Sequence, residues 1–576
     1  MKKKVIPIGI SLVLALALIL AALGALPALA KSYSISGTVS YTGEAEGDIY
    51  VLALDSSDRR ALRDALNEYN VPDLDIFVAY DKIRHVGDYE IKGLEDEEDY
   101  YVYAWMDTND DDDVDFDLLE PTGWHQEDAG WAKVEIEGGD VSGIDITLKE
   151  VTPYPEEDLD IEVGRYSGGT LETIEGKKVL DVWGPPDDRG YAQGYLVGPQ
   201  IRDAVEYILI EEFSGSASHY EDNIRPWIEE HMRWTETDMD ELDGIIEGME
   251  DSECDMYLPE VDRDVDVVDL MCFNAYGETW QVYSCSAAAV WGPLTENDEL
   301  KNGVIMFRSM DGENDLRKAT VLLALIMVQE PYDSSLNKWA SVMFCPGYIS
   351  TYTGMNEFGV VMEANYAPGK PSPLEESGYT ALGMLIRDVL QTADQIDTDA
   401  DVMAVHDALS EYTTTGGPVL AGADFMVAAP YYGQEAPAVV YEHDAYGGLI
   451  RYPTEDLPIG PYTICTTNHF RKYEQGEANT ARSSDCSRYR ALYEALEELE
   501  ADNYLGRGHN ATVTTETFHE RICISSGNST EYACIFKPNE RVMMVAYEDL
   551  ANKNSNAMSC EFSTYKLDDL FHFKGR

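Results

Sequence analysis

The chain has 576 residues, more than one ordinary domain holds, and its apolar fraction of 44% is typical of a globular protein and not of a disordered one. It carries 108 acidic against 41 basic residues, a formal net charge of −67. Such a charge would repel nucleic acid and anionic membrane surfaces, so neither is expected as a partner. We interpret the acidic excess as a solvated surface that keeps the protein soluble.

The first thirty residues have the features of an export signal. Three lysines follow the initial Met, an apolar stretch runs to about Leu29, and the sequence Ala-Leu-Ala ends at position 30. Cleavage of residues 1–30 would give a secreted protein, and retention would leave a membrane anchor at the cell surface. The small-x-small pattern favours cleavage.

Residues 32–150 form the first predicted domain. Short runs rich in β-branched and aromatic residues, such as 33–39 and 100–105, alternate with turn residues, which is typical of a small all-β sandwich. The prolines and acidic residues of 151–160 indicate a linker to the next part of the chain.

An acidic loop in this first domain places oxygen donors at alternate positions. A hard cation such as Ca²⁺ takes about six to eight oxygen ligands, and a short loop of this kind can wrap it. The loop departs from the EF-hand rule, because Asp112 stands where a glycine is needed. A solvated acidic turn is the alternative to a structural Ca²⁺ site. The predicted ligands are Asp107, Asn109, Asp111, Asp115 and Glu120.

The remaining chain divides at Cys285. Apolar residues recur at helical spacing over 161–284, which predicts a largely helical segment. From 285 to 576 apolar runs of strand length return, with helical patterns at about 379–394, 399–411 and 487–500. This mixture predicts an α+β enzyme built in layers.

Cys285 is the candidate nucleophile. It lies near the start of a short apolar strand, and a second strand after a polar turn ends in Arg308-Ser309-Met310-Asp311. A hairpin would bring Arg308 and Asp311 back beside the thiol, which needs a base and a stabilised thiolate to react. Cleavage between Ser284 and Cys285 would free an α-amine with a pKa near about 8, suited to act as that base. Asp311 would then hold the amine, and Arg308 would stabilise the thiolate.

This pattern resembles the cysteine branch of the N-terminal-nucleophile hydrolases, including the penicillin acyltransferase (acyl-CoA:6-aminopenicillanic acid acyltransferase) and choloylglycine hydrolase families. The family has Arg-Asn-x-Asp where this chain has Ser309 in place of the Asn. An Asn-Glu-x-Gly strand, a Thr-Asn stretch and a Ser-x-x-Ser-Arg segment follow in the family's order. The resemblance gives Asn365 and Asn468 the role of oxyanion donors and Arg488 that of supporting the nucleophile.

The resemblance also implies a fold and an activity. We expect a four-layer αββα sandwich, preceded by the all-β domain, in an exported precursor that cleaves itself before Cys285 and whose fragments stay associated. It would hydrolyse linear carbon–nitrogen bonds of a small acyl amide (or an ester) through a thioester, pass the acyl group to water or an amine, and need no cofactor for catalysis. The expected catalytic residues are Cys285, Arg308, Asp311, Asn365, Asn468 and Arg488.

Three alternatives stay open. Phospholipase B-like hydrolases of the same superfamily also begin Cys-Ser-Ala, but favour His-x-Thr-Trp where this chain has residues 308–311. A papain-like enzyme would use His469 as base, yet the sequence around Cys285 lacks the Cys-Gly-x-Cys-Trp pattern. A non-catalytic surface protein would use the all-β domain for binding and a decayed hydrolase as scaffold. The absence of Cys-x-x-Cys pairs argues against structural zinc.

Overall fold

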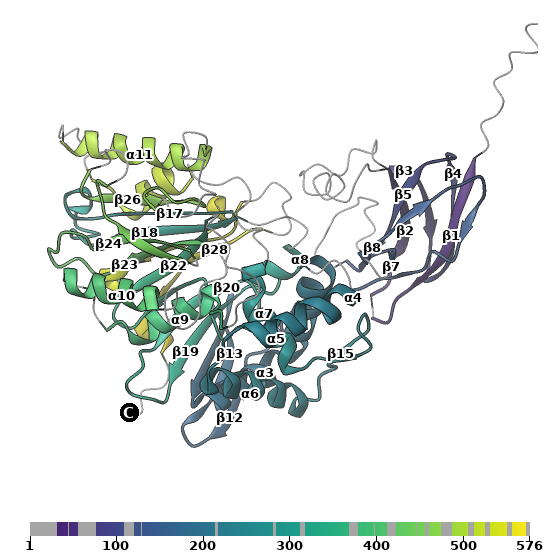
Figure 1. Ribbon diagram of the computed structural model, residues 1–576, viewed down its shortest axis with the longest axis horizontal. Helices are drawn as coiled ribbons and strands as arrows, with labels where there is room; N and C mark the ends of the chain where they lie inside the picture. Colours follow the sequence, from purple (N-terminus) through teal and green to yellow (C-terminus); the bar gives the residue numbers. More distant parts are fainter. Residues whose placement is uncertain are drawn as a thin grey trace, which may run out of the picture.

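The structure, a computed structural model, describes most of the chain from residue 32 onward (Figure 1). The residues that it does not describe are 1–31, 44, 56–76, 109–119, 128–129, 214–216, 280–283, 312–316, 368–377, 395, 397, 412–421, 445, 456–459, 474–485, 505–511, 525–529, 550–555 and 572–576. The predicted export signal therefore lies outside the described residues. None of the helices in the described part is long and apolar enough to cross a membrane.

The described residues before Val151 form strands and no helix. Their own apolar core, which includes Ile35, Val51 and Val102, lies between two sheets. One sheet contains β10 (Val141–Ser142), β1 (Tyr33–Ser40), β11 (Ile146–Thr147) and β4 (Gly87–Leu94). The other contains β3 (Phe77–Ile83), β2 (Asp48–Asp55), β5 (Asp99–Asp107), β6 (Thr122–Trp124) and β9 (Lys133–Glu135). A small hairpin pairs β7 (Gln126–Glu127) with β8 (Gly130–Trp131).

The rest of the described chain is built around two large sheets. Within the described residues the larger has ten strands, in the order β12 (Leu159–Gly164), β13 (Ser167–Ile174), β14 (Lys177–Gly184), β19 (Leu325–Pro331), β20 (Trp339–Met343), β21 (Thr353–Asn356), β22 (Val361–Tyr366), β23 (Ala423–Ala428), β24 (Ala438–Asp444) and β25 (Gly447–Arg451). The second runs β26 (Thr463–Thr466), β17 (Ser284–Val290), β18 (Ile305–Asp311), β27 (Thr530–Lys537), β28 (Val542–Tyr547) and β29 (Ser563–Lys566).

The two sheets pack face to face, with helices on their outer sides (Figure 1). Helix α11 (Ser487–Tyr504) covers the second sheet, because Tyr489, Leu492, Leu496 and Leu499 share one apolar face that meets strands β17 and β18. Helices α9 (Leu382–Thr392) and α10 (Asp399–Glu411) cover the larger sheet. The prediction of a mixed α and β fold with several sheets is confirmed, and its layers are helix, sheet, sheet and helix.

The other helices gather at the β12–β14 end of the larger sheet. They are α3 (Pro186–Ala204), the π-helix Val205–Phe213, α4 (Ala217–His219), α5 (Arg225–His231), α6 (Glu236–Asp251) and α7 (Val267–Thr279). Short helices elsewhere are α8 (Arg317–Thr320), α12 (Thr515–Phe518) and α13 (Leu567–Leu570), and a two-stranded hairpin pairs β15 (Tyr257–Leu258) with β16 (Arg263–Asp264).

Helices α3 and α6 approach each other closely because glycines line their contact. A Cβ on Gly190 would lie 1.9 Å from the carbonyl oxygen of Glu241, and one on Gly194 would lie 2.0 Å from that of Ile245. Gly244 and Gly248 of α6 face α3 in the same way. Any side chain at these four positions would push the helices apart.

The segment 161–284 differs in part from the prediction of a largely helical stretch. It opens with β12, β13 and β14, and β14 pairs in parallel with β19 from beyond Cys285. The signal for this hairpin was the Glu175-Gly176 turn, where both residues have positive φ (50° and 79°), as two-residue hairpin turns require. From α3 onward the described residues of this segment are mostly helical, apart from the β15–β16 hairpin.

Candidate active site

Cys285 is the second residue of β17, in the middle of the second sheet. The strand alternates: Cys285, Ala287 and Ala289 face the core between the two sheets, whereas Ala288 and Val290 face the core under α11. Strand β17 pairs with β18 so that Cys285 lies opposite Met310 and Ala287 lies opposite Arg308. The small side chain of Ala287 leaves room for the long Arg308 side chain to cross toward the thiol.

Arg308 contacts Cys285 from the inter-sheet side. Its Nη2 donates to Sγ of Cys285 at 3.5 Å and to the carbonyl oxygen of Ala364 at 3.3 Å. Its Nη1 donates to the hydroxyl of Tyr532 on β27, and its Nε lies 3.3 Å from Oε2 of Glu363 on β22. Arg308 is buried and held by groups from both sheets, so its charge is aimed at the sulfur.

Asn468 and Arg488 hold the backbone of Cys285. The amide nitrogen of Cys285 donates to Oδ1 of Asn468 at 2.7 Å, and Nη2 of Arg488 donates to the same oxygen at 2.8 Å. Nη1 of Arg488 donates to the carbonyl oxygen of Cys285 and, at 3.0 Å, to Oγ of Ser286. Because Oδ1 of Asn468 receives two donors, the amide is fixed with its own NH₂ group turned away from the Cys285 nitrogen.

Asp311 lies at the end of β18, opposite the backbone of Ser284 in the strand register. Its Oδ1 accepts a hydrogen bond from Oγ1 of Thr530 at 2.7 Å, and its Oδ2 lies 3.6 Å from Nη1 of Arg488. Arg488 thus connects Asp311, Asn468 and Cys285. Of the five residues predicted to act with Cys285, three contact it directly (Arg308, Asn468 and Arg488), and Asp311 contacts Arg488.

Asn365 joins the cluster through a residue that the sequence analysis missed. Its Nδ2 donates to Oε1 of Glu363 at 3.0 Å, and Glu363 is the ion-pair partner of Arg308. Glu363 and Asn365 are two residues apart on β22 and so share the face that looks toward Cys285. A glutamate in the apolar run Val-Val-Met-Glu-Ala-Asn was the signal that could have found it, since buried carboxylates are rare without a role.

Burial raises the pKa values of the acidic groups in this site. It raises the pKa of the Cys285 thiol to about 11, with Arg308 acting in the opposite direction. It raises the pKa of Glu363 to about 8 despite Arg308 beside it, and it raises that of Asp311 against Thr530 and Arg488. In the uncleaved chain the thiol is therefore neutral at pH 7 and needs a base before it can react.

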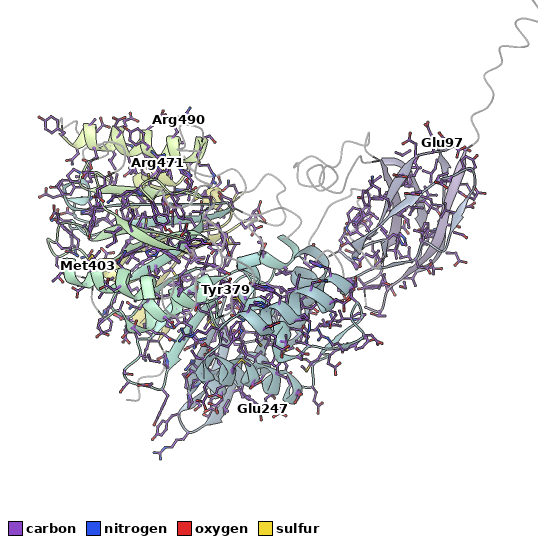
Figure 2. All side chains as sticks on the ribbon, in the orientation of Figure 1. Glu97, Glu247, Tyr379, Met403, Arg471 and Arg490 are labelled. Atoms are coloured by element: carbon purple, nitrogen blue, oxygen red, sulfur yellow. The ribbon has the colours of Figure 1, made fainter. Side chains whose placement is uncertain are left out.

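His469 takes part in a different set of contacts. Its Nδ1 lies 3.0 Å from Oγ1 of Thr467, and its ring packs edge-on against Tyr489 of α11. The neighbouring Arg471, labelled in Figure 2, stacks over the same ring, with its guanidinium carbon 4.4 Å from the centroid of Tyr489. These contacts make His469 part of the packing under α11, which does not favour the papain-like alternative.

The predicted calcium site is only partly described. Asn109, Asp111 and Asp115 lie outside the described residues, whereas Asp107 and Glu120 are buried. Oε2 of Glu120 accepts from the Trp105 indole, and Oε1 accepts from the backbone nitrogen and hydroxyl of Thr108, at 2.6 and 3.0 Å. Glu120 thus closes the base of the loop by hydrogen bonds.

Comparisons with known proteins complete this description. No family model matches the sequence, and no curated protein matches it. Among solved structures, an N-acylethanolamine-hydrolyzing acid amidase ortholog from Caenorhabditis elegans is similar at 15% identity, covering 49% of this chain and 99% of that one, with a TM-score of 0.30. A mutant conjugated bile acid hydrolase from Clostridium perfringens (10% identity, 50% and 94% covered, TM-score 0.28) and penicillin V acylase from Agrobacterium tumefaciens (13%, 50% and 89%, 0.27) are also similar. TM-scores this low assign neither fold nor family, so the function has to be inferred from the site.

Proposed function

We propose that the protein is a self-processing cysteine hydrolase of the N-terminal-nucleophile type, acting on linear amide bonds, and that its four layers are the αββα sandwich of that class. One observation carries the proposal. All three polar atoms of Cys285 are held by residues predicted to be catalytic: the nitrogen by Asn468, the oxygen by Arg488 and the sulfur by Arg308. A disulfide half or a plain core cysteine needs none of these contacts.

The first reaction is cleavage of the chain's own Ser284–Cys285 bond. Sγ of Cys285 attacks the carbonyl carbon of Ser284, the carbon–nitrogen bond breaks, and the thiol proton passes to the departing nitrogen. Water then hydrolyses the thioester, which leaves a carboxylate on Ser284 and restores the thiol. Asp311, opposite Ser284 in the register, is the nearest predicted acid to move that proton.

The freed amine then serves in turnover. Asn468 already accepts from the Cys285 nitrogen, and this contact can hold the new α-amine beside its own thiol. An amine with a pKa near about 8 can take the thiol proton, and Arg308 stabilises the thiolate that results. The thiolate attacks the substrate carbonyl, the amine product leaves with the proton, and a thioester on Cys285 is passed to water or, in the acyltransferase version, to a second amine.

The two fragments would stay together after cleavage. Strand β14 from before the cut pairs along its length with β19 from after it. The side chain of Asn274 on α7 contacts Gly347 and Ser350, and Glu241 on α6 pairs with Arg387 on α9. Separating the fragments would expose this sheet edge and leave buried charges unpaired.

Export, secretion or cell-surface anchoring, and Ca²⁺ in the acidic loop belong to the same proposal. They rest on the N-terminal lysines and apolar stretch and on the donor spacing of residues 107–115. A small acyl amide is the expected substrate, and an ester is the variant that a phospholipase B-like hydrolase would take.

N-terminal sequencing and intact mass of the purified wild type beside Cys285→Ala test the proposal. The wild type should yield a fragment that begins Cys-Ser-Ala and that co-elutes with the preceding fragment in gel filtration, whereas Cys285→Ala should remain whole. Cys272→Ala, a change at another buried cysteine, is the matched control and should still cleave. A folded wild type that stays one chain would overturn the mechanism.

A further inference from the structure

A row of polar side chains crosses three neighbouring strands beside the nucleophile. Asn365 on β22 pairs with Asp424 on β23, and Asp424 pairs with Glu442 on β24. All three are fully buried. Side chains directly opposite each other on antiparallel strands have Cβ atoms about 4.5–5.5 Å apart and share one face of the sheet. The row therefore runs from the predicted oxyanion donor Asn365 away along the inner face of the larger sheet.

Glu442, at the far end of the row, is fully engaged. Its Oε1 accepts from Nε of Arg451 at 2.6 Å and from the backbone nitrogen of Arg471 at 3.0 Å. Its Oε2 accepts from the backbone nitrogens of Lys472 and Tyr473, each at 2.7 Å. This carboxylate holds the chain immediately after the loop that carries Asn468.

Asp424, in the middle of the row, has a different set of partners. Its Oδ2 accepts a hydrogen bond from Oγ1 of Thr466 at 2.9 Å, and Thr466 is the last residue of β26 before the Asn468 loop. Its Oδ1 is buried without a hydrogen-bond partner among the described residues. The same is true there of Oδ1 of Asn365, whose Nδ2 is turned toward Glu363. Two buried acceptor oxygens on paired residues are costly unless a proton lies between them.

A neutral carboxyl group supplies that proton, because it has one O–H donor and one carbonyl acceptor. The charges around Asp424 favour the neutral form. Burial raises the pKa of Asp424 well above its ordinary value and Glu442 and Glu363 act in the same direction, whereas Arg451 and the hydrogen bond from Thr466 act against them. Thr466, the neighbour from the second sheet, is uncharged and donates to the carboxyl without supplying a compensating positive charge.

We propose that Asp424 is a positioning residue of the acyl-transfer site, whose neutral carboxyl donates to Oδ1 of Asn365 while accepting from Thr466. The inference rests on the proposed function for the role of Asn365. The contact fixes the orientation of the Asn365 amide: its oxygen is held by Asp424, one N–H by Glu363, and the second N–H remains to meet an oxyanion. The same carboxyl connects Asn365 to the strand that leads to Asn468, so that both amides are set by one group.

Substitutions at Asp424 distinguish between a neutral and an ionised carboxyl group at this position. Asp424→Asn keeps a donor and an acceptor of the same shape, so kcat on an acyl amide should stay within about threefold of the wild type. Asp424→Ala removes both, and kcat should fall by about tenfold or more with a smaller change in KM, because ground-state binding is untouched. Thr466→Val, which keeps the volume, should give a smaller loss in the same direction. Equal losses for Asn and Ala would overturn the proposal, since they would mean that the negative charge is required.

A stability measurement tests the protonation independently of catalysis. In the uncleaved Cys285→Ala background, the pKa of Asp424 is raised on folding, so its contribution to the free energy of unfolding is present below about pH 4 and is lost as pH rises. Asp424→Asn has no such loss, so its stability relative to the parent should increase from pH 4 to pH 8. An unchanged or falling difference would overturn the neutral carboxyl. A wild type that cleaves no amide would sink the proposed function, while this comparison would still decide the state of Asp424.

Discussion

Two buried clusters of charge in this molecule are built in opposite ways. Under α3 and α6, Glu241 is shared by two arginines, with Oε2 at 2.8 Å from Arg189 and 2.6 Å from Arg387. Burial alone would raise the pKa of Glu241, but the two guanidinium groups outweigh it and the pKa is lowered. Beside Cys285 a single guanidinium group does not compensate in this way: Arg308 lies next to Glu363, yet burial raises the pKa of Glu363 to about 8.

The difference separates a structural cluster from a reactive one. A carboxylate paired twice inside a protein keeps its charge and holds elements together, here helices α3, α6 and α9. Acids that stay neutral near pH 7 can accept and release protons during a reaction, and groups with shifted pKa values gather at catalytic sites for this reason. We therefore expect stability to depend on the first cluster and activity on the second.

Glu241→Ala should have the largest effect on stability. The variant leaves Arg189 and Arg387 buried without their carboxylate, and removing one partner of a buried ion pair costs about 3–5 kcal/mol. Chemical unfolding of the uncleaved protein measures the loss. Glu247→Ala, on the exposed side of the same helix (Figure 2), should change the free energy of unfolding by less than about 0.5 kcal/mol. Comparable losses for the two variants would mean that the paired cluster is not structural.

Arg488→Ala should have the largest effect on the reactive side. The change removes the donors to the Cys285 carbonyl and to Asn468, and loss of a donor that orients the reacting groups costs about 10²-fold in rate. We expect self-cleavage, followed by gel electrophoresis over time, to slow by about that factor. Arg490→Ala on the exposed face of the same helix (Figure 2) should cleave at the wild-type rate. A slow Arg490 variant would point to α11 as a whole instead of its site-facing arginine.

The sequence predicts those helices and strands whose own residue pattern determines their structure. The helices over 399–411 and 487–504 follow from apolar residues at helical spacing, and Asp399–Glu411 has the predicted bounds. Strands β12–β14 were missed although their hairpins are local, and the pairing of β14 with β19, more than 140 residues along the chain, is the part that no local pattern could show. Local spacing does not carry that information.

Prediction of the site from the sequence was limited in the same way. Arg308 and Asp311 could be placed near Cys285 because one hairpin joins β17 and β18. Tyr532 comes from β27, a distant strand of the same sheet as Cys285, whereas Glu363 and Asp424 come from the other sheet, so long-range strand pairing and the stacking of the two sheets bring them together. Their importance comes from burial beside one another, which no spacing along the chain reveals.

Glu363→Gln should change how stability depends on pH. The pKa of Glu363 is raised from 4.5 to about 8 on folding, so the wild type loses stability as pH rises over this interval, and the neutral glutamine does not. Thermal unfolding of both proteins in the Cys285→Ala background should show the difference moving in favour of glutamine from pH 5 to pH 8 and levelling off only at higher pH. A constant difference would mean that Glu363 is ionised throughout, as Glu241 is, and would remove the contrast between the clusters.

Tyr532→Phe should have the smallest effect of these substitutions, and it tests how much one contact of Arg308 contributes to the reactive cluster. The Tyr532 hydroxyl accepts from Nη1 of Arg308 and lies 3.4 Å from Oγ1 of Thr353. Phenylalanine fills the same volume, so packing is kept, but one guanidinium donor is left without this acceptor at a cost of about 1–3 kcal/mol. Because Arg308 then has less to hold it against the thiol, the rate of self-cleavage should fall by about tenfold. Tyr489→Phe, at a buried tyrosine of α11 away from Arg308, is the control and should cleave normally. If Tyr532→Phe cleaves as fast as the wild type, Arg308 is positioned by Glu363 and the Ala364 carbonyl alone, and the reactive cluster is smaller than the contacts around Cys285 suggest.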